Sequence, residues 1–478
     1  MKKTIAFLLS FLIIFTALLP MQNASAYNAS LIPNLTLQQK NVPSNDAMKF
    51  VYNLKLGWNL GNTFDAIDCT NVGNELDYES AWVGVKTTKA MIDLLKQKGF
   101  NAVRIPVSWH NHVSGSDYKI SDAWMNRVQE VVNYCIDNKM YVIINIHHDN
   151  EKKNSAYFYP NSANLETSKK YISSIWKQIA TKFANYDEHL IMEGMNEPRL
   201  IGHTNEWWID PNNADCIDSI KCINQLNQVF VDTVRATGGN NASRYLMCPG
   251  YCASPEGATN SNFKLPTDKS GVVNKLIVSV HAYSPYNFAL QPNSEGGTSY
   301  WSVNDSTSVN GVTSFMDSIY NKYISQGTPV IIGEFGSRNK DNNLQARVEY
   351  NSYYIAAARA RGISCFVWDN NLFSGTGELF GLLNRAAYRF DNAEIVDGMV
   401  KYAGNGGQTE PEIVYGDVNK DGNIDAIDYA KFKQDYLLNP NHGYDEALDL
   451  NLDKTIDAID FAILKQYLLG IITTLPKK

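Results

Sequence analysis

The sequence has no surplus of basic residues over its 478 positions. Lys and Arg number 42 against 49 Asp and Glu, so the formal net charge is −7 at pH 7. Proteins that bind nucleic acid neutralise phosphates with basic side chains, so this balance argues against nucleic acid as a partner. No glycine-rich loop of the G-x-G-x-x-G form opens a helix either, which argues against a doubly wound nucleotide-binding sheet.

Cysteine is sparse and odd in number, with seven residues. Cys216 and Cys222 are close in sequence, as are Cys248 and Cys252. Neither pair is a C-x-x-C with a second such pair at zinc spacing. We therefore expect no structural zinc. A disulfide is compatible with these positions but is not required by them.

Long apolar runs are also scarce, and the longest one lies at the N-terminus. Two lysines precede an apolar run over 5–19, which is short for a membrane span. Residues 24–26 read Ala-Ser-Ala, the small-residue pattern of a cleavage site. We predict that residues 1–26 are a signal peptide and that the secreted chain begins at Tyr27. The alternative is that this segment is an uncleaved membrane anchor. No later apolar run is long enough to span a membrane, so we expect no membrane insertion of the secreted chain.

Apolar runs of strand length alternate with helical patterns along most of the chain. The expected strands are 56–62, 102–109, 141–148, 190–198, 245–248, 276–283, 329–336 and 364–369. The expected helices are 89–98, 121–139, 168–185, 218–236, 313–325, 344–361 and 394–402. Only the crossover over 252–275 looks like an extended loop with little helix. Nearly continuous apolar strands suit a sheet buried on both faces, so we predict a (β/α)8 barrel over about 45–404, within a catalytic domain of 27–404.

Two of these strands end in a glutamate. Pro198 has no N–H to give to a sheet and should end the strand that carries Glu197. Glu334 ends a second apolar run. In a parallel barrel, the C-terminal ends of the strands form the catalytic face, and a pair of carboxylates is what glycosidic bond cleavage requires. Further polar or aromatic side chains are expected at the same face, namely Arg104, His147, His148, Asn196, His281, Tyr283 and Trp368.

Six motifs occur in a defined order along the barrel. They are Leu-Gly-Trp-Asn-Leu-Gly-Asn from 56, Val-Arg-Ile-Pro-Val-Ser-Trp from 103, Asn-Ile-His-His from 145, Gly-Met-Asn-Glu-Pro from 194, Val-His-Ala-Tyr from 280 and Ile-Gly-Glu-Phe-Gly from 332. In this order they resemble glycoside hydrolase family 5, in particular bacterial endo-β-1,4-glucanases. The resemblance implies a retaining mechanism without a cofactor, with Glu197 as the acid/base and Glu334 as the nucleophile.

The same resemblance implies roles for the remaining site residues. Arg104 and Tyr283 are expected to hold the nucleophile, and Asn196 to bind the sugar 2-hydroxyl. His147, His148 and His281 are expected to surround the cleaved subsite. Trp368 is expected to form the aromatic floor of the −1 sugar and to be followed by a cis peptide bond.

Chemistry adds two conditions to these roles. The site should raise the pKa of Glu197 so that it holds a proton, whereas Glu334 must be ionised. Neighbours on a regular strand face opposite ways, so Asn196 and Glu197 can share the site only if the strand tip is irregular.

Specificity stays open at this point. The substrate is expected to be cellulose or a related β-glucan, and the alternatives are xyloglucan, mixed-linkage β-glucan, mannan or xylan. A non-catalytic carbohydrate-binding barrel is a more remote alternative, against which the presence of both glutamates argues. Trp82, Trp207 and Trp208 lie in loops, where stacking on sugars and ordinary loop packing are equally compatible with the sequence.

A duplicated segment follows a Gly-rich linker over 405–413. Residues 417–428 and 449–460 share the register D-x-N-x-D-x-x-x-D-x-x-D, which places oxygen ligands where a calcium loop has them. The expected ligands are Asp417, Asn419, Asp421, Asn423, Asp425 and Asp428 in the first loop, and Asp449, Asn451, Asp453, Thr455, Asp457 and Asp460 in the second. Helices are expected over 429–438 and 461–469. Position 6 of the loop is Gly422 in the first copy but Lys454 in the second, where a positive φ would be strained.

This duplicated segment, 414–478, closely resembles a type I dockerin. The resemblance implies two bound Ca2+ ions, a cohesin of a scaffolding protein as partner, and therefore an extracellular enzyme attached to a cellulosome. It also implies that the cohesin is recognised by Ala426, Ile427, Ala458 and Ile459.

Overall fold

The computed structural model describes residues 27–70, 72–151, 157–269, 271–405, 415–418, 424–438 and 445–476. The predicted signal peptide, most of the predicted linker and three expected loop ligands, Asn419, Asp421 and Asn423, lie outside the described residues. Within the described part, no helix is both long and apolar enough to cross a membrane.

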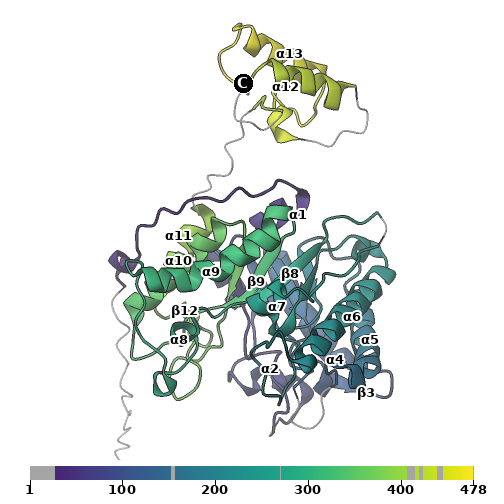
Figure 1. Ribbon diagram of the computed structural model, residues 1–478, viewed down its shortest axis with the longest axis vertical. Coiled ribbons are helices and arrows are strands. Elements are labelled where there is room, and N and C mark those ends of the chain that lie inside the picture. Colours follow the sequence, from purple (N-terminus) through teal and green to yellow (C-terminus); the bar gives the residue numbers. More distant parts are fainter. Residues whose placement is uncertain are drawn as a thin grey trace, which may run out of the picture.

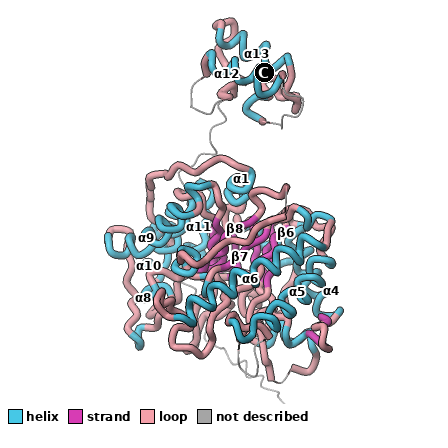
Figure 2. The backbone as a smooth tube through the Cα atoms, turned by 45° about the vertical axis from the view of Figure 1, so that its right-hand side comes forward, coloured by secondary structure: helices cyan, strands magenta, loops and turns pink. Residues whose placement is uncertain are grey.

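Eight parallel strands close into a barrel in the order β1-β10-β9-β8-β7-β6-β5-β2. These strands are β1 (Gly57–Asn59), β2 (Ala102–Ile105), β5 (Tyr141–Asn145), β6 (Leu190–Glu193), β7 (Leu246–Pro249), β8 (Leu276–His281), β9 (Val330–Phe335) and β10 (Ser364–Val367). Figure 2 shows them enclosed by helices. The predicted (β/α)8 fold is therefore confirmed. Several strands are shorter than predicted because the apolar pattern continues into the loops at the catalytic face; Pro106, for instance, follows β2 and cannot donate to a ladder.

The surrounding helices are α3 (Lys89–Lys98), α4 (Asp122–Asp137), α5 (Leu165–Lys182), α6 (Ala214–Ala236), α9 (Ser306–Lys322), α10 (Leu344–Arg359) and α11 (Ala393–Asn405). Helix α3 has the predicted bounds and ends at Gly99, whose φ of 112° suits glycine. In the described part of the fifth crossover, the helical segments are a 3-10 turn (Tyr251–Ala253) and the short α7 (Pro255–Thr259), so it is mostly loop, as predicted. Figure 1 shows α4, α5 and α6 on the right of the barrel, and α9, α10 and α11 on the left.

Three helices of the described barrel were not predicted from the sequence: α1 (Asp46–Asn53), and the four-residue helices α2 (Tyr78–Ala81) and α8 (Tyr286–Ala289). Helix α1 packs Phe50 and Val51 against a cluster of inward-facing strand residues such as Ile143 and Ile331. The Phe50 ring stacks on Tyr245 at 3.7 Å between ring centroids. Tyr245 precedes β7, so α1 covers the N-terminal end of the barrel and leaves the C-terminal end for the site.

The C-terminal repeats form helices α12 (Ala426–Phe432) and α13 (Ala458–Leu468). Both begin three residues before the predicted start. The reason is a capping box in each copy, in which the Asp425 and Asp457 side chains accept helix N–H groups. The two helices share a small apolar core in which the Tyr429 and Phe461 rings stack at 4.2 Å. The predicted positive φ of Lys454 is confirmed at 70°.

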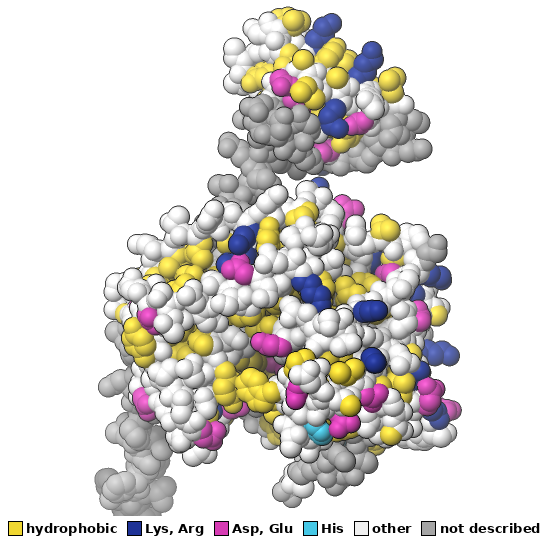
Figure 3. All heavy atoms as spheres, in the orientation of Figure 1, with side chains coloured by type: hydrophobic (Ala, Val, Ile, Leu, Met, Phe, Trp, Pro, Cys, Tyr) yellow, Lys and Arg dark blue, Asp and Glu magenta, His cyan; other side chains and the backbone are white. Residues whose placement is uncertain are grey.

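Charged side chains of both signs are interspersed on the face shown in Figure 3. That face therefore presents no continuous basic surface of the kind that tracks a nucleic acid backbone. This distribution agrees with the acidic net charge of the chain.

Candidate active site

Arg104 lies at the centre of the polar residues at the C-terminal end of the barrel. It is fully buried near the end of β2. Its guanidinium donates from Nε to Glu193 at 2.8 Å, from Nη1 to Glu334 at 2.7 Å and from Nη2 to the Asn196 side chain at 2.7 Å. Arg104 thus links two other predicted site residues, Asn196 and Glu334, which come from different parts of the barrel. A further bond of 3.0 Å from Nη1 to Asn59 fixes the guanidinium plane.

Glu334 is presented by an irregularity in β9. The β8–β9 register pairs Val280 with Ile332 but His281 with Glu334, so one extra residue, Gly333, bulges between them. A Cβ at Gly333 would lie 3.0 Å from the His281 ring, so glycine is required for this close approach. The Tyr283 hydroxyl donates to the second carboxylate oxygen of Glu334 at 2.9 Å.

Asn196 and Glu197 reach the site together because regular pairing in β6 has already ended at Glu193. The Asn196 N–H bonds to the carbonyl of Ile146, and the residues beyond it follow an irregular path. The expected irregular strand tip is therefore present. The Glu197 carboxylate lies 2.8 Å from His281 Nδ1.

Glu197, His281 and Glu334 form one cluster of titratable groups. One side-chain nitrogen or oxygen of each lies within 4.8 Å of those of the other two. Burial alone would lower the pKa of His281, but Glu334 and the bonds to Glu193 and Glu197 raise it to about 9. His281 is therefore protonated near neutral pH.

The predicted pKa shift of Glu197 is wrong for the free enzyme. Burial acts to raise its pKa, but the hydrogen bond from protonated His281 and the charge of Arg199 outweigh burial and lower it. Burial raises the pKa of Glu334, although His281 and Arg104 favour its ionised form. The proton closest to Glu197 in the free enzyme is thus carried by His281.

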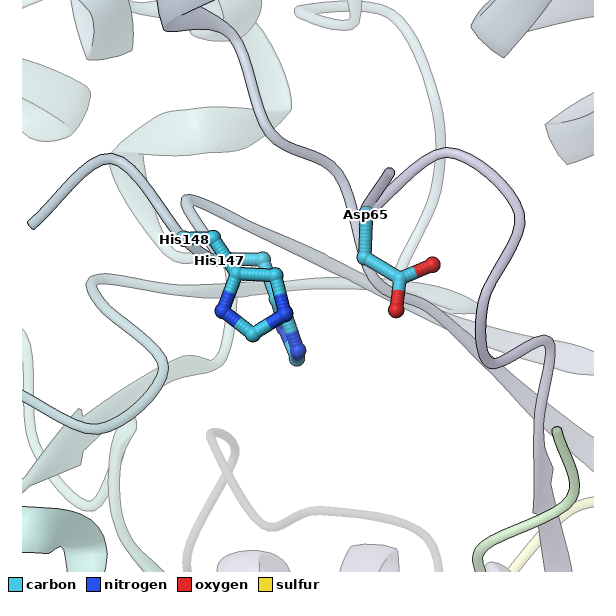
Figure 4. A group of neighbouring side chains, drawn as sticks. All are labelled: Asp65, His147 and His148. Atoms are coloured by element: carbon cyan, nitrogen blue, oxygen red, sulfur yellow. The ribbon is translucent and has the colours of Figure 1, made fainter. Parts of the chain in front are cut away.

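The His147 and His148 rings meet edge to face at 4.3 Å between centroids, and Figure 4 shows Asp65 across from them. Burial, with nearby positive charges, lowers the pKa of both imidazoles, to about 4 for His148. Both rings are therefore neutral. The His147 ring is nearly parallel to Trp368, at 6 degrees and 6.1 Å between centroids, which places the predicted aromatic floor beside the histidines.

Two groups of residues in the described part have the donor types of a metal site: Asp65 with His147 and His148, and Glu197 with His281 and Glu334. Both Asp65 oxygens already accept backbone N–H groups, from Asn62 and Thr63. The second group holds a protonated histidine, which is not a ligand. The carboxylates of the second group are already paired with Arg104 and His281.

The expected cis bond between Trp368 and Asp369 is wrong: the cis bonds of the described residues precede Pro285 and Pro476. A trans bond here avoids the cost of about 3–4 kcal/mol for a cis bond before a residue other than proline. Asp369 is held instead by the Trp58 indole N–H, at 2.9 Å from its carboxylate.

Glu193 is a site residue that sequence analysis missed. It is fully buried beneath the cluster and contacts Arg104, Asn145 and Ser279. Burial would raise its pKa, but the charge of Arg104 is among the interactions that lower it to about 2. The available signal was a lone charged residue inside the apolar run 190–195, four positions before Glu197.

The three loop tryptophans are all exposed on the surface. Trp82 and His148 line a hollow of about 550 Å³ together with Asp68, Cys69 and Glu151. The Trp207 ring lies over the Arg199 guanidinium at 4.0 Å, and Trp208 contacts Tyr286 edge-on. These exposures and contacts fit both of the predicted roles, stacking on sugars and packing within loops.

A parallel barrel whose C-terminal face pairs two glutamates among Arg, Tyr and His side chains defines a glycoside hydrolase. Comparison with protein families gives the class more closely. Residues 65–374 match the family described as cellulase (glycosyl hydrolase family 5), and residues 415–469 match the dockerin type I domain. The chain belongs to glycoside hydrolase family 5, is an endoglucanase of that family, and carries a type I dockerin.

Individual relatives agree with this assignment. The chain is 41% identical to cellulase/esterase CelE of Acetivibrio thermocellus over 82% of its own length, and spans 47% of that larger protein. The solved catalytic domain of CelCCA is 68% identical, with a TM-score of 0.77, and the match covers 79% of this chain and 98% of that one. A solved family 5 lichenase from Caldicellulosiruptor sp. F32 is 58% identical, with a TM-score of 0.76, over 78% of this chain and 99% of that one.

Proposed function

We propose that this protein is a secreted, retaining endo-β-1,4-glucanase that hydrolyses internal bonds of cellulose or related β-glucans and is attached to a cellulosome scaffold. The observation that carries the mechanism is the short separation of Glu197 and Glu334, whose carboxylates approach within 4.8 Å. Retaining enzymes hold the two carboxyl groups about 5–5.5 Å apart, whereas inverting enzymes need about 6.5–9.5 Å for a water molecule.

Glu334 is the proposed nucleophile. Arg104 and Tyr283 each bond one of its oxygens and hold them in fixed positions, so attack on the anomeric carbon needs little rearrangement. The reaction requires the ionised carboxylate, and burial raises its pKa. The rate should therefore fall as the pH decreases through a value above the ordinary pKa of glutamate.

Glu197 is the proposed acid/base. When sugar displaces water from the cleft, the ion pair of His281 and Glu197 loses solvation, which favours moving the proton from Nδ1 to the carboxylate. Glu197 then gives this proton to the leaving oxygen, and later removes one from the water that hydrolyses the glycosyl-enzyme. The proposed role of Asn196, whose side-chain oxygen accepts a bond from Arg104, is to bind the sugar 2-hydroxyl. The proposed role of His147, His148 and Trp368 is to surround the cleaved subsite.

The test of substrate class is a panel of polysaccharides with analysis of the products. Carboxymethyl cellulose and mixed-linkage β-glucan should be cleaved to oligosaccharides with a rapid fall in viscosity. The likeness to a solved lichenase favours mixed-linkage β-glucan as a second substrate. Activity confined to mannan or xylan would contradict the glucanase assignment, and binding without release of sugar would contradict catalysis.

The proposed domain organisation is a signal peptide over 1–26, the catalytic domain over 27–404, a linker over 405–413 and the dockerin over 414–478. A type I dockerin binds calcium and implies a cohesin partner. We propose two Ca2+ ions, one in each loop, because carboxylate and amide oxygens are the donors that Ca2+ prefers. In the second loop, Asp449 accepts the N–H groups of Asp453 and Lys454, which already curves the chain around the expected ion site.

Cohesin contact is proposed at the starts of helices α12 and α13. Ile427 and Ile459 are 57% and 55% exposed, each beside an alanine at 426 or 458. The two faces are near copies, so the module could dock in either of two orientations. Calorimetry against a cognate cohesin should show substantial binding after one Ala-Ile pair is made charged and none after both are. Loss of binding from a single change would contradict docking in two orientations.

The calcium sites lead to a specific expectation for Lys454. A non-glycine residue in the left-handed conformation costs about 1–2 kcal/mol, and its ammonium group adds a positive charge near the ion. Lys454→Gly should therefore tighten the second, weaker site about tenfold, as measured by calorimetric titration of the chelator-treated protein with Ca2+. Lys431→Ala, which removes a charge from α12 outside the loops, is the matched control. Equal affinities in wild type and Lys454→Gly would contradict the strain argument.

A further inference from the structure

We propose that Arg199 is a positioning residue that joins Glu197 to a sugar-binding platform, Trp207, on which a pyranose ring next to the cleaved bond stacks. The inference rests on the proposed function, because it takes Glu197 as the acid/base. It concerns a cation and an aromatic ring that the catalytic cluster does not include.

Arg199 is almost fully buried, and its guanidinium is bonded on every edge. It donates from Nη2 to Glu151 at 2.6 Å, from Nε to Glu206 at 3.2 Å and from Nη1 to the backbone carbonyl of Glu197 at 3.2 Å. The same Nη1 lies 3.9 Å from the Glu197 carboxylate. One side chain therefore fixes both the backbone and the charge environment of the proposed acid/base.

The face of this guanidinium is covered by Trp207. The Arg199 Cζ lies 4.0 Å from the ring centroid, within the range of a cation–π contact. Trp207 is nonetheless 51% exposed, so one face of the indole rests on Arg199 and the rest of the ring is open to solvent. A flat apolar surface held rigidly from below suits the C–H face of a pyranose ring, and it lies one guanidinium away from Glu197.

The loop that carries Trp207 is held as firmly as the arginine. Glu206 also accepts the N–H of Gly202 at 2.8 Å, and its backbone carbonyl accepts from the Cys252 thiol. The Tyr251 hydroxyl donates to the carbonyl of Asn205 at 2.8 Å. These bonds fix the position of the indole before substrate arrives, which lowers the entropic cost of binding.

The charged groups around Arg199 and Glu197 determine how removal of Arg199 should change the pKa of Glu197. Glu197 interacts with the following titratable groups besides Arg199: His281 of β8, Glu334 of β9, His148 after β5, Cys252, Tyr283 and Glu378. Arg199 itself faces the acidic groups Glu151 and Glu206 and the thiol of Cys252. An opposite charge at this distance typically lowers a carboxyl pKa by about 1–3 units, so its loss moves the pKa of Glu197 upward.

The experiment compares Arg199→Met, Arg199→Lys and the control Arg235→Met, which removes a buried arginine paired with Asp268 at 2.8 Å. On soluble β-glucan, Arg199→Met should lower kcat/KM about 10- to 100-fold. In the free enzyme Glu197 and His281 share one proton, so the basic limb of kcat/KM reports this pair. Loss of the Arg199 charge should shift that limb upward by about 1 unit. Arg199→Lys should leave that limb in place. The leaving group of dinitrophenyl cellobioside needs no proton. On this substrate, the pH profile of kcat/KM should therefore show no basic limb that depends on protonation of Glu197.

A basic limb that stays fixed in Arg199→Met would overturn the proposal. If the wild-type enzyme had no basic limb on β-glucan, the acid role of Glu197 would fail instead, so the two failures are distinguishable. Near-UV circular dichroism of each variant separates a folding defect from a change at the site.

Trp207→Ala gives a second test that does not require removal of the buried cation. In an inactive Glu334→Gln background, it should weaken binding of cellohexaose roughly 3- to 10-fold by calorimetry. In the active enzyme, the effects of Arg199→Met and Trp207→Ala on kcat/KM should be less than multiplicative, because each disrupts the same contact. Unchanged affinity, or fully multiplicative effects, would overturn the platform.

Discussion

Replacement of Glu334 by glutamine is expected to abolish turnover on every substrate. Glutamine preserves the size of the side chain, but its amide is a poor nucleophile and cannot form the glycosyl-enzyme. By comparison with other enzymes that lose their nucleophile, kcat should fall about 10⁵- to 10⁶-fold, or about 7–8 kcal/mol of barrier. The loss should be equally complete for β-glucan and for activated aryl cellobiosides.

Steady-state hydrolysis of dinitrophenyl cellobioside checks this expectation. The matched control is Glu349→Gln on α10, where the carboxylate accepts hydrogen bonds from Ser302 and Val303 but lies outside the cluster. This control should retain wild-type rates. Residual activity of Glu334→Gln above about a hundredth of wild type would mean that another group forms the covalent bond.

Glu197→Ala is expected to separate the two halves of the reaction. On β-glucan, loss of the general acid should cost about 10²- to 10⁴-fold. On dinitrophenyl cellobioside, the glycosylation step needs no proton, but water attack on the glycosyl-enzyme still needs a base. The variant should therefore release a burst of dinitrophenol equal to the enzyme concentration, followed by a slow steady state.

Stopped-flow absorbance resolves the burst from the steady state. The control is again Glu349→Gln, because Glu206, a nearer carboxylate, bonds Arg199. This control should show neither the loss of activity on β-glucan nor the burst. Equal losses for Glu197→Ala and Glu334→Gln on the activated substrate would mean that the two roles are assigned wrongly.

Much of the barrel could be predicted from sequence because both of its signals are local. Apolar runs mark strands buried on both faces, and the residue after each run marks the catalytic face. Arg104, Glu197 and Glu334 therefore appear in the expected places. Strand ends were overestimated because the apolar pattern continues past the last ladder bond, and α1 was missed because it lies within a polar lead-in.

The features that could not be predicted depend on residues far apart in the chain. The lowered pKa of Glu197 is caused mainly by His281, 84 residues away. Glu193 becomes a site residue only because Arg104 crosses the barrel to reach it. In the dockerin, the capping boxes moved both helix starts, since Asp425 and Asp457 had been assigned to calcium loops rather than to helix caps.

The stereochemistry of the first product tests the central claim most directly. Two displacements at one carbon, first by Glu334 and then by water, return the anomeric centre to its starting configuration. Proton NMR during the first minutes of cello-oligosaccharide hydrolysis should show β-anomers appearing first, with α-anomers rising only through mutarotation. If α-anomers form first, water attacks directly, and the assignment of Glu334 as nucleophile is contradicted.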